Sequence, residues 1–289
     1  MSIHPHAIVS PQAELGRDVQ IGPFTIVEPD VDIGDGCILE SSVVIQQGTK
    51  LGKNNHVFAG AVIGGIPQHV RPPQRLGGLE IGSNNTIREY ATIHRGLHEG
   101  GRTVVGDNNM LMVGAHLAHD CQVGNNTIFA NSVLLAGHVS VEDRAFVSGS
   151  VGVHQFCRIG KLAMVGGHAR VLQDVPPYVT VDGGTGMIVG LNLVGLRRNG
   201  FTSDEIKELK AAYRVIYRSG LMWNDVLAEL KRQFADGPAA VFHEFFSQGT
   251  RGFVQERRMP PTATLKIRRS DEEEAAATEA PFELTAKAG

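Results

Sequence analysis

The sequence predicts a mainly β fold, a parallel β-helix over residues 1–186, followed by a small α-helical domain. Two observations predict it: aliphatic residues recur at every sixth position through most of the chain, and the composition is rich in Gly but poor in aromatic residues. The 289 residues include 35 Gly, but only 12 Phe, 4 Tyr and 1 Trp. Because large aromatic side chains usually anchor globular cores, this chain needs a core of another kind.

The six-residue repeat starts at Ile3. Every sixth residue is apolar from Ile3 to Ile63, again in the same phase from Ile81 to Ile93, and again from Val105 to Val171. Gly often follows the aliphatic residue, and Asp, Asn or Gly often stands three positions after it. These last residue types tolerate positive φ angles at sharp corners. The repeat therefore predicts one short strand and one corner in every six residues.

Three such units close a triangular coil of about 18 residues, and coils stack at the spacing of neighbouring β-strands, ~4.8 Å. We expect the aliphatic residues to point into a dry interior whose narrow axis excludes bulky aromatics. Small residues often stand two positions before the aliphatic one, and Cys37, Cys121 and Cys157 share that inward phase. We therefore expect three packed, unpaired thiols.

The repeat is interrupted twice before it ends. It fails at His69 and Arg75, and once more at Glu99, which predicts loops near 64–80 and 94–104. It ends near Pro176 and Pro177, because tandem prolines stop ladder hydrogen bonding. The first domain is therefore assigned to residues 1–186.

A second domain, helical in character, is predicted over residues 187–254. Thr202 and Glu205 have the spacing of a capping box, and apolar residues then repeat at helical spacing up to Gly220. Further helices are predicted over 223–234 and 239–246, and a short one near 191–198. Residues 255–289 end in an acidic, Ala-rich run, so we predict a disordered tail.

Charge and hydropathy exclude several classes of protein. The net charge of −3 and pI of about 6.5 argue against nucleic-acid partners. The sequence contains no run of apolar residues long enough for a transmembrane segment, and its first residues do not resemble a signal peptide. Three cysteines without paired spacing fit a reducing compartment, so we expect a cytoplasmic protein.

The coil length places a group of polar residues in one patch. His119, Gly137 and Gln155 follow one another at 18-residue intervals, as do Asp120 and His138, so they stack on three successive coils. A histidine beside a carboxylate can take a proton from an alcohol or amine, and a glycine N–H can approach an oxyanion closely. Because no Ser or Cys nucleophile stands out, the patch favours direct acyl transfer with His119 as base.

A metal site is the alternative interpretation of the same patch. His116, His119 and His138 could ligate Zn²⁺ across a subunit interface, as in hexapeptide proteins with carbonic anhydrase-like chemistry. Asp120 and Gln155 are better suited to hydrogen bonding, so we expect no metal, but this alternative stays open.

Longer motifs make a family resemblance specific. They are Asn109–Cys121 (NMLMVGAHLAHDC), Ala136–Val139 (AGHV), Val153–Phe156 (VHQF), Gln173–Val179 and Ala212–Gly220 (AYRVIYRSG). In this order and spacing, from about residue 3 to residue 254, they resemble the hexapeptide-repeat family of acyl-ACP–UDP-N-acetylglucosamine O-acyltransferases of lipid A biosynthesis. The resemblance implies a left-handed β-helix and a homotrimer with active sites in clefts between neighbouring solenoids.

The resemblance also implies a reaction and its residues. A 3-hydroxyacyl group would pass from the thioester of acyl carrier protein (ACP) to the 3-position of UDP-N-acetylglucosamine, with no cofactor beyond the phosphopantetheine of ACP. His119 falls on the general base, Asp120 on the carboxylate that orients it, and Gly137 on the oxyanion-hole N–H. The residues implied to bind or position substrates are His116, His138, His154, Gln155, Asn192, Arg198, His69 and Arg71. ACP is acidic, so Arg197, Arg198 and Arg214 are expected contacts.

Four further positions bear on specificity. Gly167 matches the residue that limits acyl-chain length, and Gly there predicts a longer chain. His69 stands where the family usually has Asp, and Val194 and Asn199 replace an expected Glu and Arg. These departures leave an acyltransferase acting on a related 3-amino UDP-sugar as a second alternative, although that sibling family usually adds an N-terminal uridine-binding domain.

Overall fold

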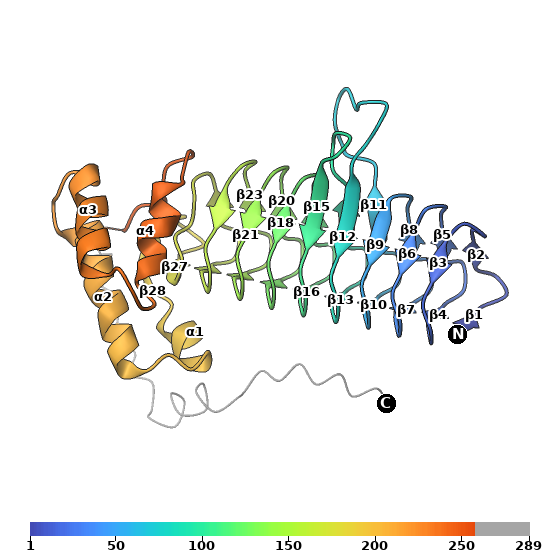
Figure 1. Cartoon of the computed structure of the whole chain (residues 1–289), viewed down its shortest axis with the longest axis horizontal. Helices are drawn as coiled ribbons and strands as arrows, with labels where there is room; N and C mark the ends of the chain where they lie inside the picture. The colour runs from blue at the N-terminus through green and yellow to red at the C-terminus, as the bar shows by residue number, and fades with distance from the viewer. Residues whose placement is uncertain (258–289) are drawn as a thin grey trace.

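Short β-strands wind through most of the chain as a long triangular prism, and four helices gather at its C-terminal end (Figure 1). The computed structural model describes residues 1–257. Most of the predicted disordered tail, residues 258–289, lies outside the described residues. Each turn of the prism contributes one strand to each of three sheets.

The strands of the three sheets follow one another along the prism axis. In spatial order, the first sheet contains β1 (Ser2–Ile3), β4 (Gln20–Ile21), β7 (Ile38–Leu39), β10 (His56–Val57), β13 (Thr86–Ile87), β16 (Met110–Leu111), β19 (Ile128–Phe129), β22 (Phe146–Val147), β25 (Met164–Val165), β27 (Val179–Val181) and β28 (Ile188–Leu191). The second contains β2 (Ile8–Val9), β5 (Ile26–Val27), β8 (Val44–Ile45), β11 (Val62–Gly65), β14 (Thr92–His94), β17 (His116–Leu117), β20 (Leu134–Leu135), β23 (Gly152–Val153) and β26 (Arg170–Val171). The third contains β3 (Glu14–Leu15), β6 (Asp32–Ile33), β9 (Thr49–Leu51), β12 (Gly78–Ile81), β15 (Arg102–Val105), β18 (Gln122–Val123), β21 (Ser140–Val141) and β24 (Arg158–Ile159).

The pairing register follows the predicted coil. Strands of successive coils pair in parallel, so that Leu117 is opposite Leu135, and Leu135 is opposite Val153. Two insertions lengthen the coil locally, residues 66–77 between β11 and β12 and residues 95–101 between β14 and β15. Both project from the prism beside the middle strands (Figure 1).

The corners of the prism explain the polar part of the repeat. Most non-glycine residues at the third position after the aliphatic one adopt positive φ, among them Asp18 at 57° and Asn54 at 53°. The prediction of a left-handed parallel β-helix followed by helices is confirmed. Bulky residues also take this corner conformation, including His138 at 59° and Phe156 at 65°. The sequence pattern did not mark these two as corners of that kind.

The interior is aliphatic along its length. Residues of the six-residue series from Ile21 onward are buried, and the three cysteines are unpaired and buried, as predicted. One expectation is wrong: Phe129 lies in the inward series with 0% of its surface exposed. Smaller residues at the other inward positions, such as Thr127, leave room for one ring in a close-packed interior.

The helices are α1 (Leu193–Arg198), α2 (Ser203–Arg218), α3 (Trp223–Gln233) and α4 (Ala240–Ser247). The capping box at the start of α2 is confirmed, because the Glu205 N–H donates to Thr202 Oγ1 while Glu205 Oε2 accepts from the Thr202 N–H. Tyr178 and Leu162, from the last coils, share a buried cluster with helical residues such as Phe242. The helices are therefore packed against the end of the prism.

The segment after α4 returns to the prism. Phe253 forms a parallel bridge with Asp174, and Glu256 forms one with Ile188 in β28. Residues 255–257, the start of the predicted disordered tail, therefore lie against the strand β28. Ile188–Leu191, the start of the predicted helical domain, form an antiparallel strand on the first sheet. Within residues 1–257 no helix is both long and apolar enough to cross a membrane.

Candidate active site

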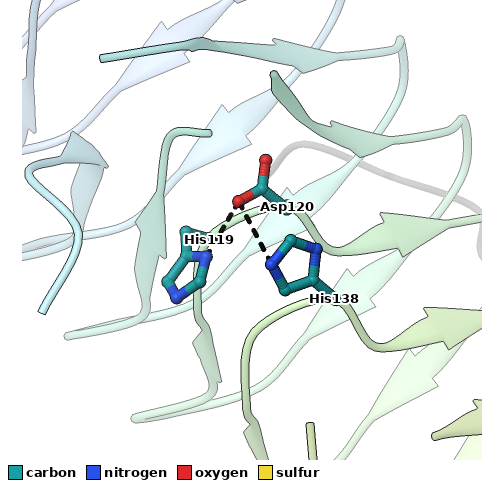
Figure 2. Close-up of side chains that lie close together, drawn as sticks. All are labelled: His119, Asp120 and His138. Carbon is teal, nitrogen blue, oxygen red and sulfur yellow. Dashed lines mark hydrogen bonds and ion pairs between the residues drawn. The ribbon is translucent and has the colours of Figure 1, made fainter. Parts of the chain in front are cut away.

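His119 and Asp120 occupy the corner between β17 and β18. The His119 Nδ1 atom lies 2.8 Å from Asp120 Oδ2, and both side chains are largely buried. Figure 2 shows the rings of His119 and His138 on either side of this carboxylate. Because Nδ1 of His119 faces the carboxylate, Nε2 is the nitrogen left for another partner.

Asp120 is held by the insertion at residues 95–101. The Leu97 N–H donates to Asp120 Oδ2 at 3.1 Å, and the Asp120 N–H donates to Thr103 Oγ1 at 2.8 Å. A Cβ built on Gly101 would stand 2.8 Å from Asp120 Oδ1, so this loop passes directly beside the carboxylate. These contacts fix the carboxylate that orients the His119 ring.

Gly137 lies one coil further on, against the ring of His119. A Cβ at this position would stand 2.6 Å from Cε1 and 2.8 Å from Nε2 of His119, distances that real Cβ atoms do not show. Only glycine therefore lets the backbone approach the imidazole this closely. Among residues 1–257, no backbone hydrogen bond engages the Gly137 N–H.

His138 completes the cluster at the same corner of that coil. Its Nε2 atom lies 3.8 Å from Asp120 Oδ2, and its ring meets that of His119 edge to face at 5.2 Å. On its other side it stacks on Phe156 with ring centroids 4.6 Å apart. Phe156 belongs to the corner of the next coil and follows Gln155, which is exposed.

The same residues form a potential set of metal ligands. Ligand atoms of His119, Asp120 and His138 all lie within 4.8 Å of one another, the one such trio in the described part of the chain. His116 is not a member of it, so the set of three histidines weighed above is not the set brought together. Two imidazoles and one carboxylate suit a divalent metal, and they equally suit a hydrogen-bonded base.

An open groove of about 630 Å³ runs beside this cluster over the second sheet. Its floor is formed by outward residues of successive strands, His116, Leu134, Gly152 and Arg170, and Gln68 reaches it from the insertion at 66–77. Ala136, next to Gly137, and His154 also line it. The groove therefore brings apolar surface and several polar groups together at the edge where His119 lies.

His116, which is half-buried, is paired with the buried His94. Its Nδ1 atom lies 2.7 Å from Thr92 Oγ1, and its ring meets that of His94 at 5.1 Å. Burial, and secondly the neighbouring His94, lowers the pKa of His116 to about 4. Burial also lowers the pKa of His94, whose Nδ1 lies 2.7 Å from the Ile66 carbonyl oxygen. His94 thus anchors the start of the insertion at 66–77.

That insertion brings His69 near the cluster. The His69 ring lies edge to face with His119, with centroids 6.4 Å apart. The Arg71 N–H donates to His69 Nδ1 at 3.2 Å, and the Arg71 residue is exposed. His69 therefore lies beside the potential base.

Three other predicted residues lie apart from the cluster. The side chain of Asn192 caps α1, accepting from the Gly195 N–H and donating to the Leu162 carbonyl at 2.9 Å. Arg198 ends α1. Gly167 is exposed at the corner between β25 and β26, whereas His119 lies at the corner on the other edge of the second sheet.

Some residues that contact the site were not predicted from the sequence. Leu97 and Thr103 contact Asp120, His94 supports His116, and Phe156 stacks on His138. Arg251 donates to Nδ1 of His154 at 2.9 Å, although 97 residues separate them. His94 and Phe156 keep the register of the repeat and could have been found by counting coils, but Arg251 lies outside it.

Family models match three parts of the chain. Residues 12–47 and 102–137 match the model described as bacterial transferase hexapeptide (six repeats). Residues 174–254 match the model described as the second domain of UDP-N-acetylglucosamine O-acyltransferase. The two models thus cover both the prism and the helices.

Similar proteins cover nearly the whole described chain. An acyl-[acyl-carrier-protein]–UDP-N-acetylglucosamine O-acyltransferase of Halorhodospira halophila is 45% identical over 257 residues, 88% of this chain and 99% of that protein. One of the same name from Synechocystis is 45% identical over 73% of this chain and 78% of its own length. The crystal structure of the Francisella novicida UDP-N-acetylglucosamine acyltransferase matches with a TM-score of 0.86 and 39% identity, covering 89% of this chain and 95% of that one.

Proposed function

The chain belongs to the acyl-[acyl-carrier-protein]–UDP-N-acetylglucosamine O-acyltransferase family, and from this we propose that it acylates the 3-hydroxyl of UDP-N-acetylglucosamine with a 3-hydroxyacyl group from ACP. This is the reaction that begins lipid A synthesis. The observation that carries the proposal is the contact of three groups at one corner: His119, its carboxylate Asp120, and the backbone of Gly137.

His119 serves as the general base. Its Nδ1 is held by Asp120 at 2.8 Å, so Nε2 is free to take the proton from the sugar hydroxyl. Asp120 fixes the tautomer and balances the positive charge that forms on the ring. Because Leu97 and Thr103 hold the residue, little reorganisation accompanies proton transfer.

The transfer proceeds without a covalent enzyme intermediate. As the hydroxyl proton moves to His119, the sugar oxygen bonds to the thioester carbon, and the carbonyl oxygen takes up negative charge. The Gly137 N–H, which has no backbone partner among residues 1–257, donates to this oxyanion. When the C–O double bond re-forms, the C–S bond breaks and the thiolate of phosphopantetheine recovers the proton from His119.

Substrate positioning falls to the rest of the groove. His116 and His154 line it, the His138 ring contacts that of the base, and the insertion at 66–77 contributes His69 and Arg71. A substrate contact for Gln155, which is exposed at the corner of the next coil, stays a prediction. Because burial keeps His116 neutral, its ring can hydrogen-bond a ligand without placing a second positive charge beside His119. Roles for Asn192 and Arg198 toward the nucleotide and ACP, and for Gly167 toward the acyl end, stay predictions.

The assembly proposed for this enzyme is a homotrimer. Apolar side chains point outward along the second sheet, with Ile8 66% and Leu134 52% exposed. Such a stripe favours contact with another copy of the chain. The groove is open along this same sheet, and a neighbouring prism would close it.

The reaction as proposed needs no cofactor of its own. The thioester donor is already activated, and neither substrate changes oxidation state. A cytoplasmic setting forms part of the proposal, because the three buried cysteines remain unpaired thiols.

Mass spectrometry of reaction products tests the proposal. Purified protein is incubated with UDP-N-acetylglucosamine and a panel of acyl-ACPs, and the expected product is the singly O-acylated sugar nucleotide. His119→Ala should lower kcat at least ~100-fold, since it removes the base. The matched control is His56→Ala, because His56 also pairs with a carboxylate, that of Glu40 at 2.8 Å, but lies on the first sheet. An active His119→Ala enzyme would remove His119 from its role.

Two alternatives have their own outcomes in this experiment. His69 beside the base favours testing the 3-amino analogue of the sugar nucleotide in parallel, and an N-acylated product made faster than the ester would reassign the acceptor. The ligand trio His119, Asp120 and His138 favours metal analysis of the same sample. Stoichiometric zinc with no acyl transfer would identify a metal-dependent protein instead.

A further inference from the structure

Arg251 approaches the groove from the C-terminal segment. The Gly252 carbonyl accepts from the Asp174 N–H, and the Val254 N–H donates to the Asp174 carbonyl, each at 2.9 Å. These two bonds fix the backbone on both sides of Phe253 against the last coils, directly after Arg251 and Gly252. Arg251 therefore adjoins a stretch of backbone that is hydrogen-bonded to the prism.

The Arg251 side chain reaches a residue that lines the groove. Its Nη2 atom lies 2.9 Å from His154 Nδ1. A guanidinium has only donors and keeps its proton in proteins, so Nδ1 of His154 must be the acceptor. A neutral imidazole that accepts at Nδ1 carries its proton on Nε2, at the far end of the ring.

A second contact of the same nitrogen favours the other tautomer. His154 Nδ1 also lies 3.1 Å from the Gln155 carbonyl oxygen, which would require a proton on Nδ1. Both contacts cannot be satisfied at once. The Arg251 contact is shorter and its donor is charged, which makes it the stronger hydrogen bond, so the tautomer with Nε2–H prevails. Without Arg251, the Gln155 carbonyl would favour the other tautomer.

The placement of Arg251 has an energetic cost. Its Nε atom is buried without a hydrogen-bond partner within residues 1–257. Leaving a buried donor unpaired destabilises the folded state. Its guanidinium also faces the buried thiol of Cys157, a weak acceptor. Packing alone does not explain why a buried donor is left unpaired here, whereas a role in orienting His154 does.

We propose that Arg251 is a positioning residue that holds His154 as the Nε2–H tautomer, so that His154 donates a hydrogen bond to an oxygen of a substrate in the groove. This inference rests on the proposed acyltransferase function. Among residues 1–257, His154 Nε2 has no hydrogen-bond partner, and His154 lines the groove. The substrate oxygen belongs to either the sugar nucleotide or the phosphopantetheine arm.

Nitrogen NMR on the full-length protein labelled at histidine tests the tautomer directly. The His154 signals are assigned by their loss in His154→Gln. We expect an unprotonated Nδ1 and a protonated Nε2 in the unchanged protein, and a shift toward the Nδ1–H form in Arg251→Ala. A protonated Nδ1 in the unchanged protein would overturn the proposal.

Kinetics test whether the tautomer matters to the substrate. Arg251→Ala should raise KM for one substrate about tenfold with kcat within about twofold, in line with losing one oriented hydrogen bond. KM is measured separately for UDP-N-acetylglucosamine and for acyl-ACP, which identifies the partner of Nε2. Arg251→Lys, which retains a positive donor, should recover part of the loss.

A double-mutant cycle and a matched control separate positioning from packing. In a His154→Gln background, Arg251→Ala should add less than about twofold, because its effect passes through His154. Arg218→Ala removes another anchor of the same segment, the 2.6 Å ion pair with Glu256, and should leave both KM values unchanged. Additive losses in the cycle, or an equal KM effect in Arg218→Ala, would refute the proposal. Absence of acyl transfer in the unchanged protein would instead refute the proposed function, while the NMR result would still decide the role of Arg251.

Discussion

Single atoms decide the geometry around His119. Its ring is held between the carboxylate of Asp120 and the bare backbone of Gly137, so neither neighbour can change without moving it. The adjacent corner residue His138 has a positive φ of 59°, and so has Phe156 at 65°. Such conformations cost a non-glycine residue of order 1–3 kcal/mol. The stack of these two rings therefore sits at corners that are less stable than those built from Asn or Gly.

Gly137→Ala should cripple catalysis while leaving the fold intact. The added methyl would displace the His119 ring, because its position lies 2.6 Å from Cε1. We expect kcat to fall roughly 100-fold, comparable to losing a positioned base, with an unchanged circular dichroism spectrum. Gly184→Ala is the matched control, since the nearest atom to its Cβ is 3.7 Å away. Equal activity in the two variants would contradict the close approach at Gly137.

Burial of His116 makes stability depend on pH. Its pKa falls to about 4 in the folded state, below the ordinary value of about 6.5. The unfolded chain thus binds the proton more readily, so stability is full above pH ~6.5 and is lost progressively as the pH falls toward 4. His94, whose pKa burial also lowers, acts in the same direction.

Urea unfolding at pH 7.5 and pH 5 measures this effect. The unfolding free energy of the unchanged protein should fall between the two, with a His116 share on the order of 1 kcal/mol after solvent screening. His116→Asn should reduce the fall, because the titrating ring is gone. His4→Asn, at an exposed position, serves as the control. A fall of the same size in His116→Asn and the unchanged protein would argue against a neutral buried ring.

At the scale of elements, two insertions turn a regular prism into a site. Residues 95–101 supply the Leu97 N–H to Asp120, and residues 66–77 bring His69 to the base and Gln68 to the groove. Strands of only a few residues place the outward side chains in straight columns one coil apart. The columns provide repetition, and the insertions provide the contacts that differ from one coil to the next.

The corner after β25 provides a test of acyl-chain length. Gly167 is exposed, and a Cβ there would meet the Gly149 carbonyl oxygen at 3.4 Å and Ser148 Cβ at 3.9 Å, both ordinary contacts. The fold should therefore tolerate Gly167→Met. If the acyl chain ends beside this corner, the variant should prefer shorter acyl-ACPs, as measured by competition and mass spectrometry. Gly167→Ala, with one methyl, should change the preference little. An unchanged profile in Gly167→Met would exclude a role in chain length.

For the whole molecule, the apolar stripe on the second sheet predicts self-association. Ile8 and Ile26 are 66% and 36% exposed at its N-terminal end, away from the groove. Replacing both with Asp would place charges in the proposed interface. We expect light scattering to show a trimer for the unchanged protein and smaller species for this variant, with activity falling in parallel. Replacing both with Val should preserve the trimer, and a trimer that survives both Asp substitutions would place the interface elsewhere.

Much of the architecture could be predicted because the coil is a local rule. Once each coil has 18 residues, counting places His119 against Gly137 and Asp120 against His138, and the structure shows those neighbours. The same rule predicted that the cysteines are buried and that the corners have positive φ. Counting also placed Phe129 inward, but the expectation that the interior excludes aromatic rings failed there, because the volume inside a coil depends on all of its inward residues together.

The periodicity of the sequence thus predicted the prism and the columns of the candidate site, and the family resemblance predicted the handedness of the prism. The folded chain alone revealed the contacts that cross this period: Leu97 on Asp120, His94 under the insertion at 66–77, and Arg251 on His154. It also set Asn192 as a helix cap and Gly167 at the opposite edge from His119. The physical reason is that repeat positions are fixed by neighbouring coils, whereas insertions and the returning C-terminal segment are placed only by packing between residues far apart in the chain.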